Sequence, residues 1–550
     1  MLPSVRDHTG PGHLRTWYGG PRRRAHSGAA GPVPPGAGHD PLGVLDLFGD
    51  GFVRDPHPWL DTLRSQAPVH HDAGTGLWLI SRHRDIRRVL LDPDAFRPDN
   101  AQHAVTPLPV AVLRVLARAG FQLPPALANN GTDSHPGLRR VITRFFNARR
   151  VEAAVPVIER LAGELLDAAR ARLDTDGEYD LFASFAQVLP CRVLMELLGI
   201  QDVDPATLIR WSDASLELFW GRPALDRQLE LAHQVCQFHQ WLTETVRTGR
   251  AADGSFVGAL ARHRLPDGTP LDAQTAVGAC FFVFIAGQST TGQLIATVLR
   301  RALSEPGMWP RVAQETEAAW ACVEEVLRRE PPVTTWRRVV ARPVELGGVD
   351  LPAGAQLLLM LMGSGSDPEV FADPERMCPH RVNIRHHLAF GAGRHRCPGA
   401  SLARTEAAVA LRAAARSLPK ARLAKGRRGR RCSACCHSGR RCVWQWPTGE
   451  EGHRHSWSVE PGTRPSLFDP DGLAPRCMVG SSARPRCVGG WPGCVGRRCV
   501  ELLWFRLGYR GLWRPVRWPG RGRLGTAPSL NPHHQLLERE QWAGEWPIDR

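Results

Sequence analysis

The sequence lacks a long apolar run, and this absence argues against a membrane anchor. A transmembrane helix needs roughly 18 or more consecutive apolar residues, and the longest candidate, residues 276–286, is soon followed by Gln288 and Ser289. The arginines at 22–24 have no apolar stretch behind them, so no secretory signal peptide is expected. We therefore expect a cytoplasmic protein without membrane attachment.

A disulfide framework is also missing. Eight of the 14 cysteines follow residue 430, and the other six are scattered through apolar or helical segments. Small secreted proteins instead carry closely and regularly spaced cysteines. We expect these six to be reduced, mostly buried thiols.

Positive charge is nearly absent from the centre of the chain, although the whole chain carries +16. Residues 425–550 contain 22 basic and 10 acidic residues, a balance of +12, and residues 1–40 contain five and two, a balance of +3. Only +1 remains for residues 41–424. The basic balance therefore belongs to the flanks, and nucleic-acid binding is not expected of the centre.

These differences divide the chain into three parts. Residues 1–40 are rich in Gly, Pro, Arg and His without an apolar period, which is typical of a disordered extension. Residues 41–424 have the pattern of a folded domain. Residues 425–550 hold nine of the 18 tryptophans and many Arg, Gly and Pro residues, while the whole chain has only two lysines. This composition fits out-of-frame translation of a G+C-rich gene, and we expect a tail with little order.

Two functional interpretations of the tail remain open. A zinc site could use Cys432, Cys435, Cys436, His437 and Cys442. The adjacency of Cys435 and Cys436 is awkward for one tetrahedral ion, and no second pair at finger-like spacing follows. Alternatively the arginines could bind nucleic acid, although the aromatic residues have no periodic relation to them. Neither interpretation is favoured.

Periodicity in the central part predicts an α+β fold in which helices predominate. A strand is expected at 77–80, and a strand pair at 344–351 around the turn Gly347-Gly348. Helical periods cover four segments, 151–172, 272–303, 314–329 and 398–417. Strands near the N-terminus followed by a long helical body give this class.

The most specific motif is the segment FGAGRHRCPG at residues 390–399. Its glycines let the backbone approach a flat cofactor closely, and Pro398 suits the first turn of the helix that follows. Cys397 would then lie at a helix N-terminus, where the dipole and free N–H groups favour a thiolate. A buried structural cysteine is the ordinary alternative, but the Phe, Gly and His residues at fixed offsets favour a cofactor site.

The longer segment FGAGRHRCPGASLARTE resembles the haem-binding signature of the cytochromes P450 in their soluble bacterial form. The resemblance implies haem b, iron protoporphyrin IX, as the cofactor and Cys397 as its iron ligand. A thiolate opposite dioxygen promotes O–O cleavage. It also implies that Phe390 packs near the ligand and that His395 contacts a haem propionate.

Further basic residues resemble propionate contacts of the family. His135 and Arg139 match its His-x-x-x-Arg pattern before a helix. Arg338 resembles the arginine that precedes the first strand of the pair at 344–351, with Arg337 an equally possible register. Without a cofactor each would be an ordinary surface charge.

The long apolar segment contains Ala286-Gly287-Gln288-Ser289-Thr290-Thr291, which resembles the oxygen-activating segment of the family. The small residues at 286 and 287 open space for a ligand, and Thr290 can donate to the Ala286 carbonyl. The resemblance implies that Thr290 governs proton delivery to bound dioxygen. Ser289 stands where the family usually has an acid, and a hydroxyl is no acid–base group near neutral pH. Slow or uncoupled turnover, or proton delivery by the substrate, would follow.

A charged set outside the haem motif resembles the structural Glu-x-x-Arg and Arg triad of the family. Glu325 and Arg328 are three residues apart on one predicted helix, and Arg381 follows later. Most pairs of this kind lie on the surface and contribute little. Their order relative to the cysteine motif favours the buried triad.

The resemblance extends from about residue 55 to 423 and implies a monooxygenase that inserts one atom of O2 into a small organic substrate, in secondary metabolism. No flavin or iron–sulfur segment is visible, so a ferredoxin and its NAD(P)H-dependent reductase would supply electrons. After residue 423 the final sheet segment of the family is not recognised. A catalytically impaired haem-binding helper or relic is therefore the second interpretation, and nucleic-acid binding through the basic tail is the third.

Overall fold

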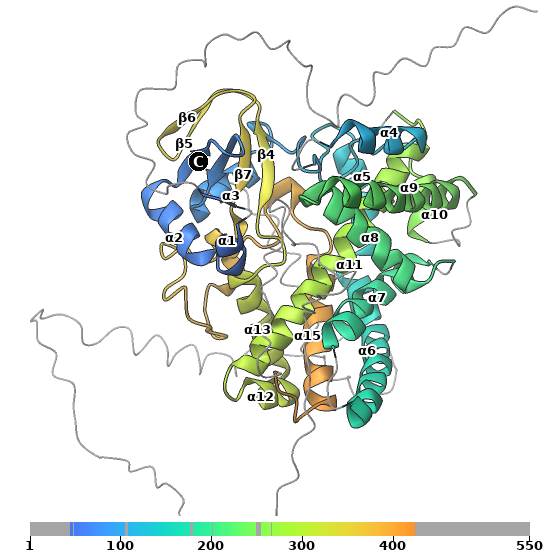
Figure 1. Cartoon of the computed structure of the whole chain (residues 1–550), viewed down its shortest axis with the longest axis vertical. Coiled ribbons are helices and arrows are strands. Elements are labelled where there is room, and N and C mark those ends of the chain that lie inside the picture. Colours follow the sequence, from blue (N-terminus) through green and yellow to red (C-terminus); the bar gives the residue numbers. More distant parts are fainter. Residues whose placement is uncertain are drawn as a thin grey trace, which may run out of the picture. The chain divides into compact units, whose positions relative to one another are not determined.

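The computed structural model describes residues 45–423 except for residues 48, 105–107, 177–179, 201, 249–254 and 266. The expected extension at 1–40 and the tail at 425–550, including its candidate zinc residues, lie outside the described residues. Figure 1 shows the chain with its elements labelled.

Helices form most of the described structure. In chain order they are α1 (Asp50–Arg54), α2 (His57–Gln66), α3 (His83–Leu91), α4 (Val110–Arg118), α5 (His135–Phe145), α6 (Ala148–Asp176), the π-helical turn η2 (Phe182–Ala186), α7 (Val188–Leu198), α8 (Pro205–Trp220), α9 (Leu225–Thr248), α10 (Phe256–Ala261), α11 (Ala273–Ser304), α12 (Met308–Gln314), α13 (Thr316–Arg329), α14 (Leu361–Ser364), the 3-10 turns η3 (Ile384–His386) and η4 (Gly393–His395), and α15 (Ala400–Ser417).

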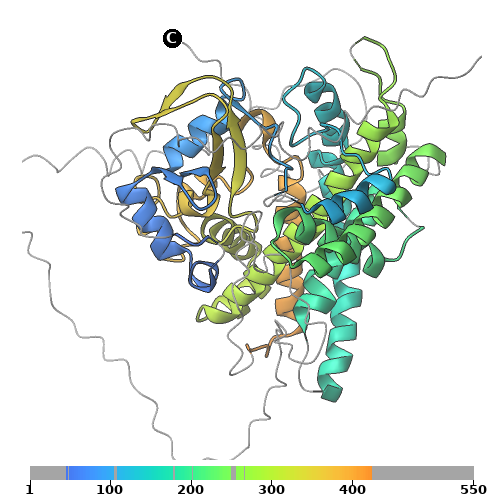
Figure 2. The ribbon, with the colours of Figure 1, turned by 45° about the horizontal axis from the view of Figure 1, so that its top comes forward.

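The strands form two small sheets. They are β1 (Val69–Asp72), β2 (Leu77–Ile80), β3 (Phe96–Arg97), β4 (Trp336–Val340), β5 (Val344–Leu346), β6 (Val349–Leu351) and β7 (Gln356–Leu359). The larger sheet has the order β1-β2-β7-β4-β3, with β2 and β7 parallel and the other neighbours antiparallel. The strands lie on one side with α2 and α3, and α4, α8, α9 and α10 lie on the other (Figures 1 and 2). The α+β class with predominant helices is confirmed.

The predicted strand pair is a hairpin. β5 pairs with β6, and the turn residues Gly347 and Gly348 have φ of 59° and 85°. Two successive residues in this left-handed region form the turn that suits a right-twisted two-residue hairpin, and glycine adopts it without strain.

All four predicted helices are present, with ends within a few residues of those expected. Two of them begin later than predicted. The segment 314–329 is broken at Glu315, whose φ of −105° and ψ of 119° are extended, so α12 ends there and α13 begins. α15 begins at Ala400 rather than at Pro398. The N–H of Cys397 donates to the Phe390 carbonyl at 2.9 Å, which closes the preceding loop and keeps Cys397 out of the helix.

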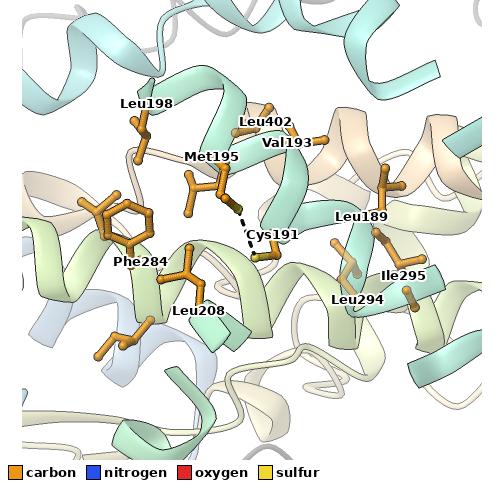
Figure 3. Packing of buried hydrophobic residues seen from close by; sticks show 14 of the residues in the cluster. Leu189, Cys191, Val193, Met195, Leu198, Leu208, Phe284, Leu294, Ile295 and Leu402 are labelled. Atoms are coloured by element: carbon orange, nitrogen blue, oxygen red, sulfur yellow. Dashed lines mark hydrogen bonds between the residues drawn. The ribbon is translucent and has the colours of Figure 1, made fainter. Parts of the chain in front are cut away.

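α11 runs through the main hydrophobic core and packs against α7, α8, α9, α13 and α15. Leu189, Cys191 and Met195 of α7 lie above Phe284, Leu294 and Ile295 of α11 (Figure 3). Burying each such side chain contributes roughly 1.5–3 kcal/mol. α11 is long and apolar enough to cross a bilayer, but 72% of its most apolar window is buried in the protein, as in a core helix.

The six cysteines of the central part are free thiols in the structure. Cys191, Cys236, Cys280 and Cys322 are buried, Cys378 is partly buried, and Cys397 is exposed. The prediction of reduced cysteines is confirmed for these residues, and only Cys397 among the six keeps an exposed side chain.

Candidate active site

The cysteine loop joins η3 to α15 and is shaped by two glycines. Gly391 and Gly393 have φ of 68° and 67°, which other residues rarely adopt. A Cβ at Gly393 would lie 2.8 Å from the carbonyl oxygen of Leu90, so this glycine lets the loop approach α3. The sequence interpretation named only the approach to a cofactor and missed this contact of Gly393 with Leu90. A Cβ at Gly391 would meet nothing within 4 Å.

Cys397 keeps an accessible surface, although many protein atoms surround its thiol and desolvate it. Burial raises the pKa of Cys397, whereas the N–H of Gly399 and the charges of Arg139 and Arg396 oppose this rise. The expectation that the helix N-terminus makes this thiol a thiolate is therefore incomplete, because desolvation outweighs the local donors. A bound metal cation would supply the missing stabilisation, since coordination deprotonates a thiol.

A buried ionic network, here called the anchor network, contacts the cysteine loop at Phe390. Its members are Glu324, Glu325, Arg328, Arg381, His387 and Arg404. Arg404 Nε donates to Glu324 Oε1 at 2.7 Å, and the Arg404 guanidinium lies 4.5 Å from the centre of the Phe390 ring. His387 Nε2 lies 2.9 Å from Glu324 Oε2. Phe390 is thereby held against α13 and α15.

Both carboxylate oxygens of Glu324 have a partner in the network. Burial alone would raise the pKa of Glu324, but the His387 hydrogen bond and the Arg404 charge outweigh it and lower the pKa to about 2. Sequence reasoning missed Glu324, His387 and Arg404. Two adjacent glutamates on one predicted helix were the available signal, because only one of them could belong to the predicted triad.

The other half of the network is the predicted triad. Glu325 Oε2 and Oε1 lie 2.8 Å from Arg328 Nη2 and Arg381 Nε, respectively. The side chains of Glu325 and Arg328 are 0% exposed, so the alternative of a surface pair is wrong. Arg328 also donates to the Pro374 carbonyl at 2.9 Å, which ties α13 to the segment before the cysteine loop.

A second charged group, here called the basic cluster, consists of His135, Arg139, Arg338 and the loop residue His395. The rings of His135 and His395 are 4.3 Å apart. Arg394, next to the cluster, donates to His135 Nδ1 at 3.2 Å. Within the described part of the chain, His135 Nε2 and both ring nitrogens of His395 are buried without a hydrogen-bond partner.

The basic cluster contains no compensating carboxylate among the groups that set its pKa values. Burial and the neighbouring cations lower the pKa of His395 to about 3 and that of His135 to about 4. Burial lowers the pKa of Arg338 to about 10. Buried cations and buried unpaired donors are unfavourable unless an anion meets them. The two propionates of haem are anions that fit this set.

β4 distinguishes the two possible arginine registers. Successive residues of a strand point to opposite faces, and both Arg337 and Arg338 are buried. Arg338 lowers the pKa of His395, whereas Arg337 lowers that of His103. Arg338 is therefore the arginine that faces the basic cluster.

The centre of α11 presents one partly exposed face in an otherwise buried helix. Phe282, Ala286 and Thr290 are partly exposed and four residues apart, so they share that face. Thr290 Oγ1 donates to the Ala286 carbonyl at 2.5 Å, as predicted. Gly287 serves packing, because a Cβ there would lie 3.2 Å from the Leu194 side chain. The expectation that Gly287 leaves room for a ligand is therefore wrong.

Ser289 lies on a buried part of α11 and does not stand alone. Its Oγ donates to Oδ1 of Asp213, on α8, at 2.9 Å. Sequence reasoning missed Asp213. The available signal was a polar group within the apolar pattern of α8, where Ser212, Asp213 and Ser215 are all buried.

The comparisons with known proteins agree with this arrangement. The sequence model described as Cytochrome P450 matches residues 314–414. Cytochrome P450 monooxygenase PikC of Streptomyces venezuelae is 34% identical over 381 residues, covering 67% of this chain and 86% of that protein. 6-Deoxyerythronolide B hydroxylase of Saccharopolyspora erythraea is 31% identical over 378 residues, covering 67% and 90%.

Solved structures share the fold. An intact type IV self-sufficient cytochrome P450 monooxygenase has a TM-score of 0.65 at 28% identity, over 70% of this chain and 50% of that chain. The fold and the cysteine loop define a haem-thiolate protein. The chain belongs to the cytochrome P450 family, and it is a monooxygenase with haem b as its cofactor.

Proposed function

We propose that this monooxygenase binds its haem through Cys397 and through the basic cluster, and that it oxidises a small organic substrate of secondary metabolism. The basic cluster carries the proposal. Its four members come from α5, β4 and the cysteine loop, and buried nitrogens of His135 and His395 have no hydrogen-bond partner within the described part of the chain. Buried polar groups are almost always paired, so a dianionic group is expected there.

The residues of the proposed site have different roles. Bound haem supplies the iron on which dioxygen is activated. Cys397 ligates it, and Phe390, fixed by Arg404, packs beside the ligand. Thr290 directs its own proton to Ala286, so its Oγ1 lone pairs remain available to accept a further hydrogen bond. Thr290 can therefore hold a proton or a water on the partly exposed face of α11, and Ser289 connects this segment to α8.

The substrate class follows from that face and from the relatives. Phe282 and Ala286 give it an apolar character, which favours an apolar organic substrate. One relative is named as the hydroxylase of 6-deoxyerythronolide B. This name supports a tailoring reaction in secondary metabolism, and a molecule of this kind belongs in the first substrate panel.

The electron donor we propose is a separate ferredoxin with its NAD(P)H-dependent reductase in the cytoplasm. Arg140 and Arg396 are exposed near the cysteine loop, whereas Arg139 and Arg394 are partly buried at the basic cluster. An exposed pair of arginines favours an acidic docking partner through long-range attraction. The similar self-sufficient monooxygenase extends well beyond the part that matches this chain.

Turnover with isotopic oxygen tests the proposal. The haem-loaded protein, a ferredoxin and its reductase are incubated with a panel of apolar organic molecules under labelled dioxygen. We expect a product that carries one labelled oxygen atom, and no product from Cys397→Ala. Haem binding without product over the whole panel would favour the helper interpretation instead.

A further inference from the structure

Asp213 is a buried carboxyl group whose hydrogen-bond partners in the described part of the chain are neutral. It lies within α8 and is 8% exposed. Its Oδ1 accepts from Ser289 Oγ at 2.9 Å, and its Oδ2 accepts from Gln187 Nε2 at 2.8 Å. A buried carboxylate is normally met by a cation, and here two amide or hydroxyl donors take that place.

The groups facing Asp213 explain its protonation. Burial raises the pKa of Asp213 to about 7, and the negative charge of Glu217 on the same helix adds to the rise. Hydrogen bonds from Ser289 and Gln187 oppose it. From α7 the group within reach is the thiol of Cys191, whose own pKa burial raises to about 12. On α9, Arg227 is paired with Glu217 at 2.8 Å, and no cation of the described part of the chain is among the groups that shift the pKa of Asp213.

We propose that Asp213 supplies, from α8, the acid that is missing beside Thr290 on α11, and that it acts through the hydroxyl of Ser289. The proposal rests on the position of Ser289, directly before Thr290, and on its direct hydrogen bond to a buried carboxyl group of another helix. Here the acid lies on α8 and the hydroxyl lies on α11. Asp213 is a positioning and proton-supplying residue, because it touches Ser289 rather than the reacting atoms.

The proton balance is simple. The Ser289 hydroxyl donates to the carboxylate form of Asp213. When Asp213 is protonated, this hydroxyl turns toward the Thr290 segment, accepts the Asp213 proton on Oγ and passes its own proton on. Asp213 is left as a carboxylate, which the Gln187 and Ser289 donors stabilise, and it regains one proton from solvent before the next cycle. Adjacent helix residues point about 100° apart, so a water molecule is needed between the two hydroxyls.

A purely structural role is the alternative, in which Asp213 only fastens α8 to α11. Asp213→Asn separates the two roles, because the amide oxygen still accepts from Ser289 and the side chain keeps its size, whereas the titratable proton is gone. Asp213→Glu keeps the acid. The exchange Asp213→Ser with Ser289→Asp moves the acid onto α11 and keeps one hydroxyl opposite one carboxyl group.

Infrared spectroscopy of the holoenzyme tests the protonation directly, without turnover. We expect a carbonyl band of a protonated carboxylic acid that fades as pH rises from 5 to 9 with a midpoint near 7. Burial also raises the pKa of Glu406 well above its ordinary value, so the Asp213 band is the component that titrates near pH 7. This component should be absent in Asp213→Asn and shifted in Ser289→Ala. If the wild-type protein has no such band, or if Asp213→Asn keeps it, the proposal is wrong.

Coupling of electrons to product tests the role in proton delivery. Each variant is compared by the ratio of oxidised substrate to hydrogen peroxide released. Asp213→Asn should lower coupled turnover by about 10²-fold or more, as the loss of a general acid does, and the exchange variant should regain most of it. Coupling in Asp213→Asn equal to wild type between pH 6 and 8, or an exchange variant no better than Asp213→Asn, would contradict the proposal.

This inference rests on the proposed function, yet the two fail differently. The Soret band of the reduced, carbon-monoxide-bound protein reports on Cys397, and the infrared band reports on Asp213. A variant that loses the Soret band is excluded from the coupling comparison, and the infrared titration of the wild-type protein then decides alone.

Discussion

The two charged groups that contact the cysteine loop, the anchor network and the basic cluster, differ in where their opposite charges come from. In the anchor network, the carboxylates of Glu324 and Glu325 meet arginines of α13, α15 and the neighbouring loop at 2.7–2.8 Å, and Glu324 also contacts His387 at 2.9 Å. In the basic cluster, buried histidine nitrogens have no such partner in the described part of the chain. The chain itself supplies the opposite charges of the first group, whereas we propose that an anionic ligand supplies those of the second.

This difference means that substitutions in the anchor network should affect folding, whereas substitutions in the basic cluster should affect cofactor binding. Breaking a self-sufficient buried ion pair removes stability from the protein with or without cofactor. Removing a member of an incomplete cluster relieves the empty protein of an unfavourable charge and weakens ligand binding. The same kind of substitution should therefore have opposite effects in the two groups.

The largest expected effect belongs to Glu325→Gln. This substitution leaves Arg328 and Arg381 buried without their carboxylate, so we expect a loss of about 3–5 kcal/mol in the free energy of unfolding. Denaturant unfolding of the haem-free protein measures it. The matched surface control is Glu164→Gln, which breaks the solvent-accessible pairs with Arg160 and Arg192 and should cost about 1 kcal/mol or less. Equal losses in the two variants would remove the distinction between the groups.

The next effect concerns the pH dependence of stability. The pKa of Asp213 is raised from 3.8 to about 7 in the folded protein. The folded state therefore favours the protonated acid, and this stability is present below about pH 4 and is lost as pH rises toward 7. The difference corresponds to roughly 4 kcal/mol at most.

Asp213→Asn keeps the protonated shape at every pH. Its free energy of unfolding should be close to that of the wild type at pH 4 and should exceed it by up to about 4 kcal/mol at pH 8. Unfolding curves at both pH values provide the measurement. A variant less stable than the wild type at pH 8 would show that Asp213 is a stabilising carboxylate.

Substitution in the basic cluster should give the opposite sign for the empty protein. Arg338→Met keeps the unbranched apolar part of the side chain and removes a buried charge, so we expect the haem-free protein to be no less stable. Haem affinity should fall by roughly 10- to 100-fold, because one charge-assisted hydrogen bond of about 1.5–3 kcal/mol is lost. Haem transfer to an acceptor globin measures this. Arg337→Met is the matched control on the other face of β4 and should retain its affinity.

The smallest effect is expected at the surface. Arg396→Glu reverses an exposed charge beside the cysteine loop. It should slow the association of ferredoxin several-fold at low ionic strength, with the difference shrinking as salt is added. Stopped-flow reduction measures the rate, and a salt-independent difference would argue against electrostatic docking.

Sequence reasoning reached the local features and missed those made by distant contacts. The cysteine loop, the Glu325 triad and the helix α11 each depend on a short pattern that is visible in the chain. The partnership of Asp213 with Ser289 joins residues 76 positions apart, and no local pattern encodes it. The same holds for Glu324, whose partners His387 and Arg404 come from later segments.

Local patterns also led to wrong or incomplete reasons for why certain residues are required. Gly287 and Gly393 were correctly noted as special positions, but both serve contacts within the protein, with Leu194 and Leu90 respectively. The helix N-terminus near Cys397 was expected to favour the thiolate, whereas burial raises its pKa. A pattern shows that a small or polar residue is required, and only the packed structure shows which neighbour requires it.

The central claim is that Cys397 ligates a haem held by the basic cluster. The most direct test is the carbon-monoxide difference spectrum of the dithionite-reduced, haem-loaded protein. We predict the red-shifted Soret band of a thiolate-ligated haem, its loss in Cys397→Ala, and its retention in Cys378→Ala, which removes a cysteine outside the loop. A band at the shorter wavelength of a haem without thiolate, or a red-shifted band that survives in Cys397→Ala, would contradict the account.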